Sequence, residues 1–300
     1  MERSGNMYYF IVNKTSGNGK GSVIWKKVQN LLEAKRVDYK VLFTDGSDQD
    51  AMLVESIIHK DISAIVVVGG DGTIHGVANS IANRDVPMGI IPAGSGNDFA
   101  RSLQIPKHHE KALNRILTGK VKKMDLGRVG HEFFITIAGI GFDGKVAKVT
   151  NESKVKKLLN KLNLGSFSYI YSLIKVLFTY EPTSATIKID EDIHHFKEVW
   201  MISVANLPYY GGGIKICPDA EADDGLLDIC VLHGVNRWEL LMVFPSAFSG
   251  KHITHKNVTM LKGKDIFITP EKELVIQCDG EIVEQKTIAL TVEKEALQIL

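Results

Sequence analysis

The feature that most constrains this chain is the stretch from Ile65 to Arg101, which reads IVVVGGDGTIHGVANSIANRDVPMGIIPAGSGNDFAR. Its first four residues are apolar and β-branched, which predicts a strand buried on both faces. A glycine-rich turn around one acid follows, formed by Gly69, Gly70, Asp71 and Gly72. Thr73 comes next, and threonine is a favourable N-cap residue. The order predicts a strand, a tight turn and a helix that opens at Thr73.

The same plan is repeated immediately afterwards. Met88 to Ile91 is expected to form a strand, Pro92 to Gly96 a turn, and Asn97 to Leu103 a helix. Glycines at such turns leave backbone N–H groups open to an anion, and a helix N-terminus adds partial positive charge. Two turns of this kind at the carboxyl ends of parallel strands predict a crevice that binds the phosphates of a nucleotide.

Composition excludes some classes of function. The chain has 300 residues, 44% hydrophobic and 24% charged, which is typical of a soluble globular protein of one large or two ordinary domains. The formal net charge of +1 gives no general attraction to nucleic acid, so we expect no nucleic-acid partner. The three cysteines are scattered, which favours a reducing compartment, and the N-terminus lacks the pattern of a secretory signal. We therefore expect a cytoplasmic protein.

The first part of the chain alternates strands and helices. A strand at Tyr8 to Val12 precedes the loop NKTSGNGKGS, and a second strand, Val37 to Thr44, precedes a helix from Ser47 to about His59. The loop lacks the spacing of a Walker A motif, because Lys20 is followed by glycine. The alternation predicts a parallel, doubly wound α/β domain over residues 1–130.

The second part has a different pattern. Seven segments read as strands, several of them joined by hairpin-length turns, which predicts an antiparallel β domain over residues 131–292. The segments are Phe133–Ile140, Ala185–Asp190, Glu198–Asn206, Leu226–Leu232, Asp265–Thr269, Leu274–Cys278 and Thr287–Val292.

The paired motifs GGDGT and PAGSGNDFA resemble those of the diacylglycerol kinase catalytic-domain family, which includes bacterial diacylglycerol and lipid kinases and, more distantly, sphingosine kinases. NKTSG near the start, and DDGLLD and CDGE near the end, match in the same order. The resemblance covers most of the chain. It implies an N-terminal domain like that of NAD kinase and phosphofructokinase, and a C-terminal β-sandwich-like domain for the lipid. It also implies that residues 293–300 return to the first domain.

The resemblance and the two glycine turns together define a predicted nucleotide site. Its residues are Asn13, Lys14, Thr15, Ser16 and Gly17, then Thr44, then Gly70, Asp71, Gly72 and Thr73, and finally Gly94, Ser95, Gly96 and Asn97. The first loop and Thr44 are included because they match family nucleotide contacts. Asn97 could equally cap the helix that follows it.

Three acids are the predicted catalytic residues. Asp71, between glycines at a strand end, is expected to bind the catalytic Mg²⁺, with capping of the following helix as the alternative. In the related kinases the glutamate of CDGE accepts the proton of the lipid hydroxyl, which implies this role for Glu281. Asp279 would then help to hold metal or water. Without the resemblance, CDGE would be interpreted as an ordinary hairpin turn.

A second, structural Mg²⁺ is implied at the acidic loop PDAEADDGLLD. By position its ligands would be Glu221, through a backbone carbonyl, Asp224, and the carbonyl of Leu226. The alternative is a solvated acidic turn.

Three further stretches bear on the prediction. His75-Gly76 departs from the Asn-Glu that the family commonly has there. The apolar stretch Leu164–Tyr180 contains Lys175 and several small polar residues, which favours a buried or groove-lining helix over a membrane span. The basic stretch 145–161 has helical apolar spacing and is open to two interpretations, a membrane-surface helix or a solvated face.

The sequence therefore predicts a kinase that uses ATP and Mg²⁺ to phosphorylate the hydroxyl of a lipid. The expected lipid is one like diacylglycerol. The lipid substrate would be reached at the inner face of a membrane. The alternatives are a kinase for a soluble acceptor such as NAD, and a catalytically silent nucleotide-binding regulator. A homodimer is left open.

Overall fold

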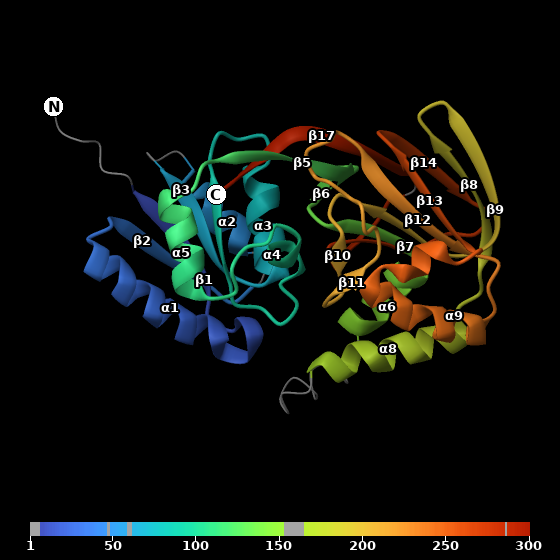
Figure 1. Cartoon of the computed structure of the whole chain (residues 1–300), viewed down its shortest axis with the longest axis horizontal. Helices are drawn as coiled ribbons and strands as arrows, with labels where there is room; N and C mark the ends of the chain where they lie inside the picture. Colours follow the sequence, from blue (N-terminus) through green and yellow to red (C-terminus); the bar gives the residue numbers. More distant parts are fainter. Residues whose placement is uncertain (1–6, 47–48, 59–61, 153–164, 286) are drawn as a thin grey trace. The chain divides into compact units, whose positions relative to one another are not determined.

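The computed structural model describes residues 7–46, 49–58, 62–152, 165–285 and 287–300, and these form two compact units. Unit 1 comprises Met1–Leu126 and Lys294–Leu300, and unit 2 comprises Gly127–Glu293. The chain enters unit 2 within strand β5 (Lys122–Val129) and returns to unit 1 within strand β17 (Ile288–Ile299) (Figure 1). The last residues of the chain are therefore part of unit 1.

Unit 1 is built on a parallel sheet. Its strands lie in the order β4-β3-β1-β2, and β17 joins beside β4 through Ile299 and Met88. The four strands are β1 (Tyr8–Asn13), β2 (Tyr39–Thr44), β3 (Ala64–Gly69) and β4 (Met88–Pro92). All six residues of β3 and all five of β4 are buried, as expected for strands covered on both faces.

Helices cover both faces of this sheet. They are α1 (Ser16–Lys35), α2 (Gln49–Glu55), α3 (Asp71–Ile81), α4 (Asp98–Ser102) and α5 (His109–Thr118). Helix α1 packs against α5, and α2 packs against α3. The strand order reverses at β1, so right-handed crossovers place α1 and α2 on opposite faces. The predicted doubly wound α/β architecture is confirmed.

Unit 2 is an antiparallel β-sandwich. Strand β9 is its longest, and it pairs with β8 along its first half and with β7 and β12 along its second half. The strands of the unit are β6 (Glu132–Phe134), β7 (Ile137–Gly141), β8 (Thr183–Ile189), β9 (Asp192–Ala205), β10 (Tyr209–Tyr210), β11 (Ile214–Lys215), β12 (Leu227–His233), β13 (Val258–Gly263), β14 (Asp265–Pro270), β15 (Ile276–Cys278) and β16 (Glu281–Val283). Residues from β5, β7, β8, β9, β12 and β14 share one apolar core, which confirms the β-rich prediction.

In the described part of unit 2, three helices and two short 3-10 turns pack on this β structure. They are α6 (Phe142–Glu152), α8 (Gly165–Thr179), α9 (Arg237–Val243), η1 (Phe244–Ser249) and η2 (Lys251–Thr254). Figure 1 shows α6, α8 and α9 together along one side of the unit. Helix α8 occupies the apolar stretch that the sequence assigned to a helix.

The structure corrects two predicted boundaries. Helix α3 begins at Asp71, with Gly70 at its N-cap, so Thr73 lies inside the first turn. The single strand expected at Phe133–Ile140 is divided into β6 and β7, because the N–H groups between them bind the side chain of Asp279.

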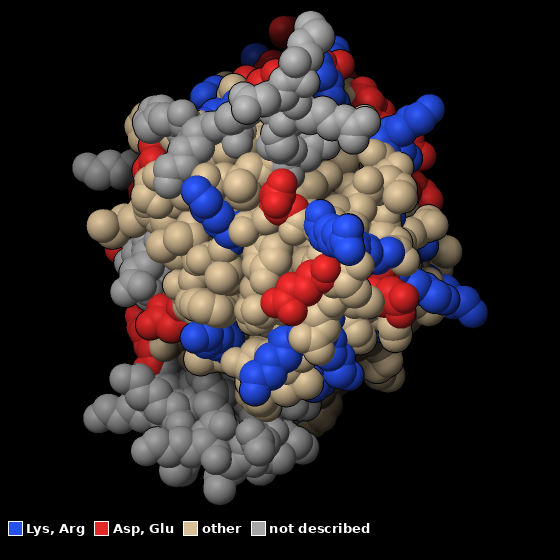
Figure 2. Space-filling view, turned by 90° about the vertical axis from the view of Figure 1, so that its left-hand side faces the viewer, with Lys and Arg blue, Asp and Glu red and all other residues tan. Residues whose placement is uncertain are grey.

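Two stretches of the sequence, Leu164–Tyr180 and residues 145–161, bear on membrane contact. No helix in the described part of the chain is long and apolar enough to cross a bilayer. Residues 153–164, which carry most of the basic stretch 145–161, lie outside the described residues. On the face that Figure 2 shows, Lys and Arg side chains are interspersed with Asp and Glu, in keeping with the net charge of +1.

The packing of α1 on the sheet gives a stability prediction. The Phe10 ring is fully buried and contacts Trp25 at 5.3 Å between centroids. We expect Phe10→Ala to lower the free energy of unfolding by about 3 to 5 kcal/mol, because it leaves a cavity between helix and sheet. Urea unfolding followed by tryptophan fluorescence measures this, with the exposed Val23→Ala as control at about 0.5 kcal/mol or less. Equal effects of the two changes would contradict the packing described.

Candidate functional site

Two glycine turns of unit 1 touch each other at the carboxyl edge of the parallel sheet. A Cβ atom on Gly94 would lie 2.6 Å from the Cα atom of Gly70, and one on Gly17 would lie 2.2 Å from the carbonyl oxygen of Ala93. Real Cβ atoms do not approach other atoms so closely. The loops after β1, β3 and β4 therefore converge on one place, and they can do so only with glycine at these contacts.

Asn13 fastens the first loop to the start of α3. Its Oδ1 atom accepts the N–H groups of Thr15 and Ser16, each at 3.0 Å, and the hydroxyl of Thr15 at 2.9 Å. Its Nδ2 group donates to Oγ1 of Thr73 at 2.9 Å. The ammonium of Lys14 lies 3.6 Å from the centre of the Phe43 ring. The structure thus brings the predicted residues of the first and second loops together.

Asp71 links the start of α3 to α4, the helices that follow the two glycine turns. It lies in the first turn of α3 and is half-buried, and its Oδ1 accepts the N–H of Phe99 in α4 at 3.1 Å. A carboxylate can accept such a bond and still bind a hard cation through its other lone pairs. The position therefore fits the predicted role at Mg²⁺, which stays a prediction.

The second glycine turn is closed by Asn97. Its side chain accepts the N–H of Gly94 and donates to the carbonyl of Gly94, both at 2.8 Å. Asn97 occupies the N-cap position of α4, but its side chain makes no capping hydrogen bond there. Ser95 is exposed at the tip, beside Gly96. The side chain of Asn97 therefore shapes the turn, while Ser95 is open to a ligand.

Thr44 forms a hydrogen bond with Asp50, a residue that the sequence did not indicate as part of the site. Its hydroxyl donates to Asp50 of α2 and accepts the N–H of Gly46 at 3.0 Å. Burial raises the pKa of Asp50, while the bond from Thr44 opposes that rise. A Cβ atom on Gly76 would lie 3.2 Å from the Cβ of Asp50. The glycine at position 76 thus leaves room for Asp50 between α2 and α3. His75 is buried, and its neighbour along the helix is Asn79, whose side chain donates to the carbonyl of His75 at 3.2 Å.

Two acids of the acidic loop of unit 2 form ion pairs with one lysine. Lys262 of β13 places its ammonium 2.7 Å from Oδ2 of Asp224 and 3.2 Å from Oδ2 of Asp228. The other carboxylate oxygen of Asp224 accepts the N–H of Leu226 at 2.9 Å. Glu221 is exposed in the same loop, and no cluster of three or more His, Cys, Asp or Glu suited to a metal occurs among the described residues. In this arrangement a Mg²⁺ at Asp224 would compete with the ammonium of Lys262 for the same carboxylate. The metal role of Glu221, Asp224 and Leu226 stays a prediction.

The CDGE turn is a two-residue hairpin between β15 and β16. Asp279 and Gly280 both have positive φ angles, 50° and 100°, as a tight hairpin turn requires. The carboxylate of Asp279 accepts the N–H groups of Ile135, Thr136 and Ile137 at 2.7, 2.9 and 3.1 Å, and the hydroxyl of Thr136. These bonds fix the turn. The role of Asp279 in holding metal or water stays a prediction. Glu281 follows at the start of β16 and is exposed.

Exposed apolar side chains gather on the helices of unit 2. Arg237 of α9 donates to the carbonyls of Leu177 and Tyr180, each at 3.1 Å, and so joins the start of α9 to the end of α8. The exposed apolar residues on these helices and on η1 are Tyr171, Ile174, Phe178, Trp238, Leu241, Met242 and Phe248. Among them, Trp238 and Met242 of α9 are 69% and 74% exposed.

A parallel α/β unit with glycine turns at its strand ends, joined to an antiparallel β-sandwich, defines the NAD kinase-like fold class. The family model described as "Diacylglycerol kinase catalytic domain" matches residues 7–129, and that described as "YegS C-terminal NAD kinase beta sandwich-like domain" matches residues 136–300. The chain belongs to the diacylglycerol kinase catalytic-domain family, in the form that carries the YegS-type C-terminal domain.

Individual relatives agree with the family. The chain is 29% identical to the diacylglycerol kinase of Mycobacterium tuberculosis over 97% of its own length and 93% of that protein. It is also 29% identical to the Bacillus subtilis protein named "Putative lipid kinase YtlR". That match covers 97% of this chain and 98% of YtlR. A crystal structure titled as a diacylglycerol kinase from Bacillus anthracis shares the fold, with a TM-score of 0.74 and 21% identity over 100% of this chain and 97% of that one.

The lysine in the acidic loop gives a second stability prediction. We expect Lys262→Met to lower the free energy of unfolding by about 1 to 2 kcal/mol, because two acids lose their shared cation. This loss lies between those typical of exposed and of buried ion pairs. Millimolar Mg²⁺ should restore part of the loss in this variant, while EDTA leaves the parent protein unchanged. Thermal unfolding measures both effects, with the exposed Lys264→Met as control. A parent protein that loses stability in EDTA would show that the loop binds a metal after all.

Proposed function

We propose that this protein is an ATP-dependent lipid kinase that transfers the γ-phosphoryl group to the hydroxyl of a diacylglycerol-like lipid. The observation that carries the proposal is the contact between the Gly70 and Gly94 turns at the carboxyl ends of neighbouring parallel strands. Backbone N–H groups at such turns bind phosphate oxygens, and the chain belongs to a family of lipid kinases.

In the proposed mechanism unit 1 binds the nucleotide. The turns Asn13–Gly17, Gly70–Thr73 and Gly94–Asn97 hold the triphosphate, and the fastening bonds of Asn13 and Asn97 keep these turns in shape before the nucleotide arrives. Asp71 would hold Mg²⁺, which neutralises charge on the phosphates when it is bound. Thr44, already bonded to Asp50, borders the same edge of the sheet. Pre-organised turns lower the entropic cost of aligning the triphosphate.

Unit 2 supplies the proposed base. The carboxylate of Glu281 takes the proton of the lipid hydroxyl as that oxygen forms its bond to the γ-phosphorus. The bond from the γ-phosphorus to its bridging oxygen breaks, and ADP leaves with the electron pair. The four bonds to Asp279 hold the turn that carries Glu281, which supports a base at a defined position.

The acceptor is proposed to be reached at a membrane surface. The exposed apolar side chains of α8, α9 and η1 support this, because they would enter the interfacial layer of a bilayer. A cytoplasmic protein that rests on the inner face of the membrane fits this arrangement. Turnover of a soluble acceptor without vesicles, or nucleotide binding with no turnover at all, would favour the two alternative functions instead.

The catalytic roles are tested by two substitutions. With radiolabelled ATP and a panel of lipids in vesicles, we expect Glu281→Gln to lower kcat by about 10²- to 10⁴-fold, because the proton acceptor is lost. Asp71→Ala should lower kcat/KM by about 10²-fold or more. The exposed Glu284→Gln, three residues along, serves as the matched control. If the parent phosphorylates a lipid and both variants keep that activity, the assigned roles are wrong.

The contact between the glycine turns gives a separate prediction on nucleotide binding. Gly94→Ala forces the two turns apart, so we expect the Kd for a fluorescent ATP analogue to rise by roughly tenfold or more. Circular dichroism should show an intact fold. The control is Val23→Ala, whose side chain is exposed on α1. Unchanged affinity in Gly94→Ala would place the nucleotide elsewhere.

A further inference from the structure

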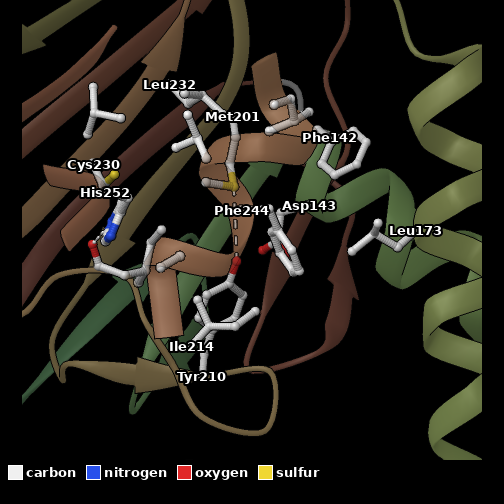
Figure 3. Close-up of a pocket in the computed structure, with 15 residues that line it drawn as sticks. Phe142, Asp143, Leu173, Met201, Tyr210, Ile214, Cys230, Leu232, Phe244 and His252 are labelled. Carbon is white, nitrogen blue, oxygen red and sulfur yellow. Dashed lines mark hydrogen bonds between the residues drawn. The ribbon is translucent and has the colours of Figure 1, made fainter. Parts of the chain in front are cut away.

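Asp50, in the first turn of α2, is a buried acid with few hydrogen-bond donors around it. A buried carboxylate is unfavourable unless donors satisfy it. Asp143 of unit 2, at the wall of an apolar pocket, shows the usual arrangement, because Gln277 donates to it at 2.9 Å and Tyr210 lies beside it as a second partner (Figure 3). For Asp50, the hydroxyl of Thr44 is the one side-chain donor among the residues that the structure describes. The carboxylate of Asp50 can therefore accept further hydrogen bonds.

The hydroxyl of Thr44 offers a ligand an acceptor and no donor. Its proton is directed to Asp50, and one of its two lone pairs accepts the N–H of Gly46 at 3.0 Å, so the other lone pair remains. Burial raises the pKa of Asp50, the bond from Thr44 opposes that rise, and the nearby Asp45 adds to it. A ligand group that meets this pair must donate a hydrogen bond. A phosphate oxygen, which is a negatively charged acceptor, does not suit it.

Thr44 and Asp50 lie beside the loops of the proposed nucleotide site. Thr44 is the last residue of β2, and its register partner in β1 is Asn13, which fastens the first loop to α3. The hydroxyl of Thr15 donates to the carbonyl of Asp45 at 3.2 Å, so the loops after β1 and β2 are joined directly. The strand order reverses at β1, and open sheets of this class bind ligands at the carboxyl ends of the strands at such a reversal. In dinucleotide-binding sheets an acid near the phosphate loop accepts a ribose hydroxyl.

Two glycines leave the flanks of Thr44 and Asp50 without side chains. Gly46 is exposed, and Gly76 of α3 is partly exposed. A Cβ atom on Gly76 would lie 3.4 Å from Oδ2 of Asp50, at the position where the family commonly has a glutamate. Thr44 and Asp50 are themselves 6% and 5% exposed, so the opening admits one small group rather than a ring. A ribose hydroxyl is a donor of this size, and the ribose is the part of ATP that carries the phosphates.

We propose that Thr44 and Asp50 form a ribose-recognition site, in which the carboxylate of Asp50 accepts a ribose hydroxyl of ATP and makes the protein select ribonucleotides over their deoxy forms. The inference deepens the proposed kinase function and rests on its nucleotide site. The bond from Thr44 holds the carboxylate in place before the nucleotide arrives, which limits the entropic cost of binding. A hydrogen bond to a carboxylate is charge-assisted, so its loss changes affinity by about tenfold or more.

Two variants and a control test the inference. Asp50→Ala removes the acceptor, and Asp50→Asn removes the charge while keeping the shape of the side chain. The control is Glu55→Gln, which changes an exposed acid at the other end of α2. Isothermal titration calorimetry with Mg²⁺ present measures the Kd for ATP, 2′-deoxy-ATP, 3′-deoxy-ATP and inosine triphosphate. The two deoxy analogues each lack one ribose hydroxyl, and inosine triphosphate lacks the amino group of adenine. Circular dichroism checks that each variant is folded.

The expected result is a loss of discrimination rather than a general loss of binding. The parent binds ATP about tenfold more tightly than one of the two deoxy analogues, and that analogue identifies the hydroxyl. Asp50→Ala raises the Kd for ATP about tenfold and leaves the Kd for the same analogue nearly unchanged, because the bond is already absent there. Asp50→Asn keeps part of the preference, since an amide oxygen accepts a weaker bond. Glu55→Gln binds all four nucleotides as the parent does.

Three results would overturn the inference. The first is equal binding of ATP and both deoxy analogues by the parent. The second is an equal loss for all four nucleotides in Asp50→Ala, which would show that Asp50 only maintains the loop. The third is a preference for ATP over inosine triphosphate that disappears in Asp50→Ala, which would assign the acid to the adenine amino group.

Lipid phosphorylation with ATP and the two deoxy analogues as donors separates this inference from the proposed function. If the parent discriminates in binding, Asp50→Ala does not, and no lipid is phosphorylated, then the ribose site stands and the kinase function fails. If a lipid is phosphorylated with the same kcat/KM from ATP and from both analogues, then the kinase function stands and the ribose site fails.

Discussion

The account depends on the approach of two backbone segments, at Gly70 and Gly94. Their Cα atoms come so close that neither residue could carry a side chain without displacing a turn. This approach is possible because β3 and β4 are adjacent and parallel, so that their carboxyl ends meet at one edge of the sheet. The glycines thus bring unshielded backbone N–H groups together where two helices begin, an arrangement suited to phosphate groups. Asn13 and Asn97 then hold these turns with side-chain hydrogen bonds.

Unit 2 is organised around its own hairpin turn. Asp279 accepts bonds from the residues between β6 and β7, and Gln277 ties the same turn to Asp143 on α6. A turn held from both sides can keep an exposed carboxylate such as Glu281 in place without burying it. In the other acidic loop, Asp224 and Asp228 share an ion pair with Lys262. Each acid in this unit thus has a distinct local environment, although in sequence they look alike.

Much of the architecture could be predicted from the sequence because it is recorded in local patterns. Buried β-branched runs such as Ile65–Val68 and the glycines after them are sufficient to indicate a parallel sheet with turns at its edge. Boundaries were harder to predict. Thr73 looks like an N-cap, but the helix already begins at Asp71, and Thr73 bonds to Asn13, sixty residues away. The partners of several side chains could not be predicted either. No spacing in the sequence pairs Lys262 with Asp224, or Thr44 with Asp50.

The central claim is that the glycine turns of unit 1 hold a triphosphate while Glu281 of unit 2 acts on the acceptor hydroxyl. A crystal structure of the protein with a non-hydrolysable ATP analogue and Mg²⁺ would test it most directly. The account predicts the phosphates against the backbone of Gly70–Thr73 and Gly94–Asn97, with the Glu281 carboxylate within about 6 Å of the γ-phosphorus, close enough to bond to an attacking hydroxyl. A nucleotide bound away from these turns, or a γ-phosphate that Glu281 does not approach in a complex with lipid also bound, would contradict it.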